Sequence, residues 1–269
     1  MPTIQSTDQL GNVLKFDVLP KRIVSLVPSQ TELLFDLGLD EEVVGLTKFC
    51  IHPEEKVKSK LKVGGTKKFD IEKIKSLNPD LIIGNKEENY IEGIEVLGKH
   101  FPVWMSDIYT LHGAYTMMKE VGRIVDREQK GRELVAEIKK EFENFRVENS
   151  VIQIPRRSCA YFIWRKPYMV AANNTFINHM LEVFGLKNVF ANAERYPEIQ
   201  PEILAELNAD FIFLASEPYS FSEKHFDEFR SFSPVSKVVL VDGEMFSWYG
   251  SRLRLAAGYF RQLQQSLTF

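Results

Sequence analysis

Short apolar runs alternate with helix-like segments along this chain, in two series that flank one long stretch of helical periodicity. The strand-like runs are residues 22–27, 43–47, 81–84, 102–106, 158–163, 168–171, 211–215 and 237–241. Segments with helical spacing separate them, at residues 31–37, 71–77, 91–97, 176–184, 201–207, 223–229 and 252–267. Buried strands that alternate with helices are typical of mostly parallel sheets covered on both faces. The pattern therefore predicts an α/β fold.

The stretch between the two series contains no proline from Leu111 to Val147 and carries apolar residues at helical spacing. It predicts one amphipathic helix of about 35 residues, roughly 50 Å long at 1.5 Å per residue. A helix of that length is longer than one compact domain needs. We therefore expect two α/β lobes with mostly parallel central sheets, residues 1–110 and 150–269, joined by one long rigid helix at residues 111–149.

Six identities at a constant offset of 130 residues relate the two series. The matched pairs are Glu72 and Glu202, Leu77 and Leu207, Asn78 and Asn208, Asp80 and Asp210, Ile82 and Ile212, and Glu87 and Glu217. Both copies have the pattern of a short helix, an Asn-x-Asp turn and a buried strand, although Asn and Asp also suit such turns for local reasons. We infer a repeated structural unit in the two lobes.

The composition excludes several classes of function. With 34 basic and 37 acidic residues the formal charge is -3, whereas a nucleic-acid-binding surface normally shows a basic excess. No apolar run reaches the roughly 18 residues that span a bilayer. The sequence has none of the glycine-rich phosphate-binding, nucleophile-elbow or zinc-helix motifs, and its five histidines are scattered. We therefore expect a protein that is not an enzyme, with no catalytic residues, no bound metal of its own and no membrane insertion.

Polar and aromatic residues follow the predicted strands, and in open α/β sheets ligands bind at the carboxyl ends of strands. Loops in the second half hold Trp164, Tyr168, Tyr219, Trp248 and Tyr249. Aromatic faces with a few convergent polar groups suit a large, flat, partly apolar ligand, although aromatics also pack lobes together. Arg252 opens the last predicted helix, where a cation is disfavoured by the helix dipole. This suggests an anionic partner for Arg252, with stacking on Trp248 as the alternative.

Glu72 and Glu202 both lie at helix starts, where the helix dipole already favours an acid. Because they are equivalent in the repeat, they also predict a two-point acidic contact for basic sockets on a symmetric partner.

Several segments resemble one family, the helical-backbone receptors that bind metal chelates for ABC importers. The residues that carry the resemblance are Arg22–Glu32 with Leu37-Gly38, Phe49–Pro53, Asn78–Ile82, Thr175–Leu181 and Gly185–Phe190. The opening segment is similar to that of the cobalamin-binding members, and the resemblance covers the chain from about Arg22 to Leu267.

The resemblance implies a substrate-binding protein that captures a metal chelate without covalent chemistry in a cleft between the lobes. A cobalamin-type corrinoid is the first choice, a ferric siderophore or haem the next, and no cofactor is intrinsic. The predicted ligand-binding residues are Pro28, Ser29, Lys48, Phe49, Lys68, Phe69, Lys86, Trp164, Arg165, Tyr168, Tyr196, Tyr219, Phe246, Trp248 and Arg252. Glu72 and Glu202 would dock on the transmembrane permease. We expect a monomer, located in the periplasm or at the cell surface if a leader has been removed and in the cytoplasm otherwise.

The chain departs from the cobalamin-type pattern at two places where relatives often have tryptophan. It has Lys67-Lys68 and Asn85-Lys86 there, and these lysines, with Arg165, Lys166 and Arg195, would suit an anionic ferric chelate. Two other functions stay open: a cytosolic corrinoid- or tetrapyrrole-binding module, and a two-lobed metal-cofactor enzyme.

Overall fold

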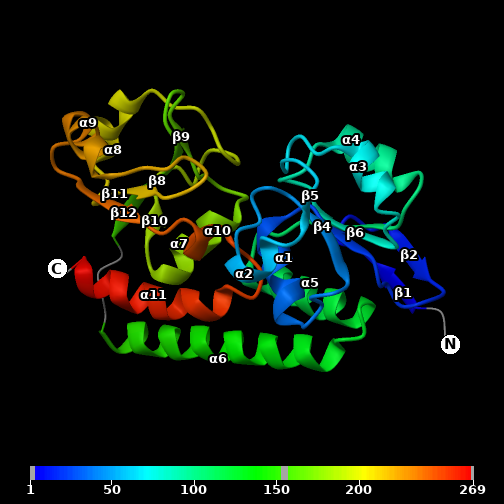
Figure 1. Cartoon of the computed structure of the whole chain (residues 1–269). Helices are drawn as coiled ribbons and strands as arrows, with labels where there is room; N and C mark the ends of the chain where they lie inside the picture. Colours follow the sequence, from blue (N-terminus) through cyan, green and yellow to red (C-terminus); the bar gives the residue numbers. More distant parts are fainter. Residues whose placement is uncertain (1–3, 153–156, 268–269) are drawn as a thin grey trace. The chain divides into compact units, whose positions relative to one another are not determined.

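The computed structural model describes residues 4–152 and 157–267 and divides into two compact units. Unit 1 comprises Met1–Ile108, His112–Lys139 and Tyr249–Arg254, and unit 2 comprises Tyr109–Leu111, Lys140–Trp248 and Leu255–Phe269. Each unit contains one central sheet (Figure 1). Residues 153–156, which the sequence placed at the start of the second lobe, lie outside the described residues.

The sheet of unit 1 has five parallel strands in the order β5-β4-β3-β6-β7. These strands are β3 (Ile23–Ser25), β4 (Val43–Leu46), β5 (Leu61–Lys62), β6 (Leu81–Asn85) and β7 (Val103–Ser106). All residues of β3 and β6 are buried, which explains why they are continuous apolar runs in the sequence. The sequence therefore located four of the five strands and missed only the two-residue β5.

Helices connect these strands, and an antiparallel hairpin precedes them. The elements are β1 (Ile4–Thr7), β2 (Val13–Phe16), α1 (Pro28–Asp36), α2 (Glu54–Val57), α3 (Ile71–Ser76), α4 (Ile91–Gly98) and α5 (Leu111–Ile124). Nothing in the sequence pattern predicted the β1–β2 hairpin.

The sheet of unit 2 has the parallel order β10-β8-β11-β12, with β9 antiparallel to β8. The strands are β8 (Ser158–Trp164), β9 (Met169–Val170), β10 (Lys187–Asn188), β11 (Phe211–Ala215) and β12 (Lys237–Val241). The remaining helices are α7 (Phe176–Phe184), η1 (Pro201–Ile203), α8 (Leu204–Leu207), η2 (Glu223–His225), α9 (Phe226–Phe232), α10 (Glu244–Ser247) and α11 (Leu253–Ser266).

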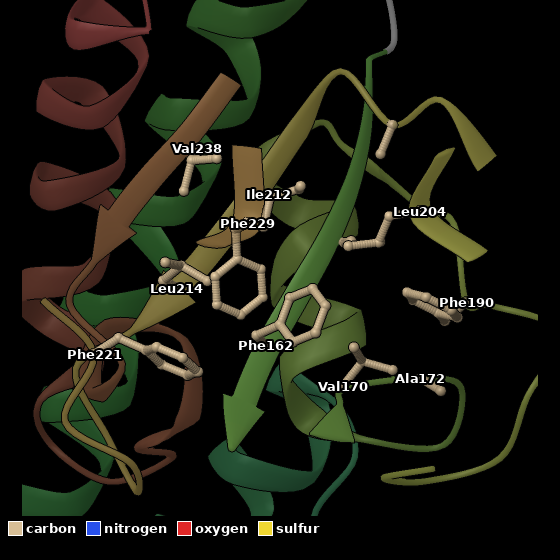
Figure 2. Packing of buried hydrophobic residues seen from close by; sticks show 12 residues of the cluster. Phe162, Val170, Ala172, Phe190, Leu204, Ile212, Leu214, Phe221, Phe229 and Val238 are labelled. Carbon is tan, nitrogen blue, oxygen red and sulfur yellow. The ribbon is translucent and has the colours of Figure 1, made fainter. Parts of the chain in front are cut away.

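One face of the unit 2 sheet is packed mainly by aromatic and branched side chains (Figure 2). Phe162 of β8 and Phe229 of α9 meet nearly edge to face, with ring centroids 4.7 Å apart and planes at 70°. Both rings are fully buried, and burial of a side chain of this size contributes about 1.5–3 kcal/mol to the free energy of unfolding. This contact fixes α9 on the sheet and with it the loop that follows β8.

The two copies of the repeat have the same turn conformation and similar hydrogen bonds, each in its own unit. Asn78 and Asn208 both adopt a left-handed conformation, with φ of 42° and 45°. The Asp80 carboxylate accepts hydrogen bonds from the backbone N–H groups of Lys21 and Arg22, just before β3. The Asp210 carboxylate accepts one from the N–H of Ser158, at the start of β8. The repeat predicted from the sequence is therefore a real structural unit.

The predicted single helix from residue 111 is wrong in one respect, because the structure has two helices in this stretch. Helix α5 ends at Ile124 and α6 (Glu128–Ile152) begins after a turn in which Asp126 has a φ of 56°. A Cβ atom built on Gly131 of α6 would lie 3.0 Å from the carbonyl oxygen of Met118 in α5. The two helices thus pack closely as an antiparallel hairpin, and only α6 is a long continuous helix, with 25 residues.

Candidate functional site

Each sheet has one place where the chain reverses the direction in which it adds strands. In unit 1 the chain moves from β3 to β4 and β5, then returns to place β6 on the other side of β3. In unit 2 it moves from β8 to β10 and then places β11 on the other side of β8. Ligands of open α/β sheets bind at such switch points, outside the carboxyl ends of the strands. The loops after β3 and β6, and those after β8 and β11, are therefore the candidate sites.

In unit 1 the buried side chain of Asn89 forms hydrogen bonds with the segments that follow β3 and β5 and with the end of β6. Its Nδ2 donates to the carbonyl oxygens of Leu26, after β3, at 3.2 Å and Thr66, after β5, at 3.1 Å. Its Oδ1 accepts from the N–H of Asn85 at 2.8 Å. Helix α1 starts between these loops without a side-chain cap and without an acid in its first turn. Its N-terminal dipole is uncompensated and favours an anionic group.

A lysine-rich surface lies beside this point in the loops after β4, β5 and β6. Phe49 is 51% exposed, and the Lys48 Nζ lies 5.0 Å from the centre of its ring. Gly65 makes room for that ring, because a Cβ there would lie 3.2 Å from it. The Lys67 ammonium donates to the carbonyl oxygen of Glu87. Phe49 is therefore a large apolar side chain that lies outside the hydrophobic core.

The segment Tyr249–Arg254 completes unit 1. The Tyr249 hydroxyl donates to Glu88 at 2.6 Å, and the Arg252 guanidinium binds Glu32 of α1 through two hydrogen bonds of 2.9 and 2.7 Å. Gly250 lies so close to α1 that a Cβ would be 2.2 Å from the carbonyl oxygen of Ser29. This segment therefore holds the start of α1 and the loop after β6.

In unit 2 two aromatic rings mark the switch point. Trp164, the last residue of β8, is 39% exposed and meets Tyr219 of the β11 loop with ring centroids 5.7 Å apart, at 69°. The Glu228 carboxylate accepts hydrogen bonds from Arg165 at 2.9 Å and from the Tyr168 hydroxyl. Burial opposes ionisation of Glu228, but these two bonds outweigh it and hold the pKa below its usual range. Burial, followed by this hydrogen bond, raises the pKa of Tyr168 to about 12.

A second carboxylate at this edge, the half-buried Glu217, follows β11. It accepts hydrogen bonds from the Ser247 hydroxyl at 2.6 Å and from the Trp248 indole at 2.8 Å. Burial is the main reason that the pKa of Glu217 is raised. Trp248 is accordingly fixed by its own unit.

The predicted ligand-binding residues fall into three groups by exposure. Exposed ones are Lys48, Phe49, Lys68, Lys86 and Trp164; half-buried ones are Pro28, Arg165, Tyr168, Tyr196, Tyr219 and Arg252; buried ones are Ser29, Phe69, Phe246 and Trp248. Phe69 is 5% exposed, with its ring centroid 4.5 Å from that of Tyr90.

One of these predictions needs correction, and a second residue has a partner within the chain. Phe246 is fully buried against Tyr161 and Phe260 in the core of unit 2, so it does not face a ligand. The anionic partner that the sequence suggested for Arg252 is Glu32 of the same chain.

Three carboxylates that position site residues, Glu32, Glu88 and Glu228, were not predicted from the sequence. Glu88 and Glu228 belong to no motif, and Glu32 ends the Arg22–Glu32 segment, but no sequence signal identified the partner of any of the three. The predicted docking residues Glu72 and Glu202 both have exposed side chains in the first turns of α3 and η1. Glu72 makes one exposed ion pair, with Lys75 at 2.8 Å.

Two negative findings apply to the described residues. Over residues 4–152 and 157–267, no three or more His, Cys, Asp or Glu side chains are arranged to hold a metal ion. None of the helices in the same part of the chain is long and apolar enough to cross a membrane.

Comparison with known proteins shows which family this chain belongs to. The sequence profile of the family described as periplasmic binding protein matches residues 23–233. An ABC transporter substrate-binding lipoprotein, YvrC of Bacillus subtilis, is 30% identical over 206 residues, which cover 72% of this chain and 63% of that protein. A vitamin B12-binding protein of Vibrio campbellii is 25% identical over 198 residues, covering 68% of this chain and 70% of the relative.

Solved structures share the fold at lower identity. The vitamin B12-binding protein BtuF of Vibrio cholerae superposes with a TM-score of 0.77 at 19% identity, over 91% of this chain and 98% of its own. The haem-binding protein RhuT of Roseiflexus sp. RS-1 gives a TM-score of 0.75 at 21% identity, over 92% and 97%. With two α/β units, a long helix and a profile match over residues 23–233, this chain belongs to the periplasmic binding protein family of metal-chelate receptors.

Proposed function

We propose that this chain is the substrate-binding component of an ABC importer and that it captures a metal chelate non-covalently. The observation that carries the proposal is the pair of exposed aromatic side chains, Phe49 and Trp164, at the carboxyl edges of the two sheets. Large apolar side chains exposed at strand ends provide area for a flat, partly apolar ligand. We propose that the strand-end loops of both units contribute binding residues.

Curated relatives and solved neighbours indicate which chelates to test. Their names specify vitamin B12 or haem, and another neighbour is described as part of an Fe3+-hydroxamate transport system. A cobalamin-type corrinoid, the first choice from the sequence, is therefore tested beside haem and ferric siderophores. We propose a monomer that acts outside the cytoplasmic membrane, and the comparisons give the cytosolic alternative no support.

Titration of purified protein with cobalamin, haem and ferric siderophores, followed by absorbance and tryptophan fluorescence, tests chelate binding. Phe49→Ala and Trp164→Ala should each weaken the binding of the cognate chelate by roughly 10-fold or more, because buried aromatic anchors dominate ligand affinity. Val235→Ala is the matched control, since Val235 is 73% exposed but precedes β12 at the amino edge of its sheet. Failure of every chelate to bind, or an equal loss in the control, would contradict the proposal.

We further propose that Glu72 and Glu202 dock on the permease. Both side chains are exposed in equivalent first turns, so neither is committed to its own core. The double substitution Glu72→Arg and Glu202→Arg should abolish association with the permease and leave chelate affinity unchanged. A control pair, Glu133→Arg and Glu137→Arg on α6, should leave both unchanged. Loss of chelate affinity in the first pair would show that the docking face is misplaced.

A further inference from the structure

Three lysines on the strand-end loops of unit 1 have no carboxylate partner within the described part of the chain. Lys48, Lys67 and Lys68 are exposed. The Lys48 Nζ lies over the Phe49 ring at 5.0 Å, and the Lys67 ammonium binds only a backbone carbonyl. Elsewhere in this chain lysines readily pair with acids, as Lys56 does with Asp40 at 2.7 Å.

The three lysines belong to one continuous surface. The Lys48 N–H donates to the carbonyl oxygen of Gly64 at 2.8 Å, and the Gly65 N–H donates to that of Lys68 at 2.8 Å. These bonds place the loops after β4 and β5 side by side. The contact of Lys67 with Glu87 continues the surface to the loop after β6.

Three acids of the adjoining loops are bonded to groups other than these lysines. Glu88 accepts the Tyr249 hydroxyl, and Asp107 pairs with Lys86 at 2.8 Å. Asp70 caps α3 by accepting the N–H of Lys73. Within the described residues, none of these three acids forms an ion pair with Lys48, Lys67 or Lys68. The first turn of α1, which carries no acid, adds positive potential at the same edge.

We infer that unit 1 selects its chelate by negative charge. Resting on the proposed function, this inference narrows the ligand to an anionic metal chelate with carboxylate or similar groups at its edge. Lys48, Lys67 and Lys68 bind those groups, and the Phe49 ring packs against the apolar plane of the ligand. Charge-assisted hydrogen bonds are stronger than neutral ones, so a neutral, amide-fringed corrinoid binds less well. This reverses the ranking that the sequence suggested.

The test compares chelates that differ in charge. One pair is iron(III) protoporphyrin IX and its dimethyl ester, which share ring and metal but differ by two carboxylates. A second pair is a ferric tris-catecholate, a trianion, and a neutral ferric tris-hydroxamate, and cyanocobalamin is the corrinoid arm. In the pair that binds, the anionic member should bind roughly 10-fold or more tightly than the neutral one. Its affinity alone should fall as salt is raised, because ions screen exposed charges.

A triple variant, Lys48→Gln, Lys67→Gln and Lys68→Gln, should lower the affinity for the anionic member by roughly 10-fold or more and so remove that preference. The control is Lys99→Gln, Lys140→Gln and Lys224→Gln, which changes the net charge equally at exposed lysines elsewhere. The inference would be overturned if both members bound with equal affinity, or if the neutral member or cobalamin bound more tightly. An equal loss of affinity in the control variant would overturn it as well. None of these outcomes would contradict chelate capture itself. If no chelate binds at all, the proposed function fails with it.

Discussion

Two carboxylates, the buried Glu32 and the half-buried Glu217, are stabilised in different ways. Burial raises the pKa of both. Glu32 is bound by the Arg252 guanidinium, and the two side chains are 11% and 10% exposed. Glu217 has only the neutral donors Ser247 and Trp248. The charged form of Glu217 is therefore the less well compensated of the two.

Glu217 should make stability depend on pH. Because its pKa is above 4.5 in the folded state, the folded protein holds this proton to a higher pH than the unfolded chain does. Its contribution to stability is therefore present below pH 4.5 and is lost as the pH rises through the folded pKa. Urea unfolding between pH 4 and 7 should show that Glu217→Gln reduces this loss. An unchanged pH profile would contradict the assignment.

Removing one partner of the Glu32–Arg252 pair should be costly. Arg252→Leu leaves a buried, unpaired carboxylate and should lower the free energy of unfolding by about 3–5 kcal/mol, whereas the double variant Glu32→Leu, Arg252→Leu should be near neutral. Arg254→Leu, which breaks a more exposed pair with Asp36, should cost much less. Urea denaturation measures all three. A double variant as unstable as Arg252→Leu would show that the pair itself stabilises the fold.

At the scale of elements, strand positions could be predicted from the sequence because buried parallel strands are continuous apolar runs. The turn between α5 and α6 could not, because apolar residues keep helical spacing on both sides of it. Its cause is tertiary: Gly122 and Gly131 let two helix backbones approach, and a close-contact glycine has the same local pattern as any other. Phe246 was misplaced for a similar reason, since an aromatic after a strand can be core or surface.

The helix contact at Gly131 gives a matched pair of glycine substitutions. Gly131→Ala should destabilise the protein by about 1–3 kcal/mol, because its Cβ would press on the Met118 carbonyl oxygen at 3.0 Å. Gly258→Ala in α11 has no neighbouring atom within 4 Å and should stabilise the protein by up to about 1 kcal/mol through helix propensity. Thermal and urea unfolding measure both. Equal effects would mean that the α5–α6 contact is looser than described.

At the scale of the whole molecule, the two parallel sheets share one strand order, in which the first parallel strand lies between the next parallel strand and a later one. The repeat of Asn78, Asp80 and their counterparts made this shared order predictable. The side-chain partners in the site were not predictable, because they join residues up to 220 positions apart. Sequence spacing carries no information about such contacts.

Helix α6 contributes residues 128–139 to unit 1 and the rest of its length to unit 2. Bending a continuous helix is unfavourable, so chelate binding should produce a modest rearrangement. The radius of gyration measured by small-angle X-ray scattering should agree, within error, between the free and chelate-loaded protein. A variant with three flexible residues inserted after Lys139 serves as the comparison and should change on loading. A large change in the natural chain would contradict the prediction.

The placement of Tyr249–Arg254 in unit 1 determines when that unit can be finished during synthesis. Glu32 emerges from the ribosome early, but its partner Arg252 follows 220 residues later. Contacts of such long range slow folding, so the first-made half of the chain stays incomplete until translation is almost over. In a chain made from its amino end, unit 1 therefore lacks the Tyr249–Arg254 segment until nearly the whole protein has been synthesised.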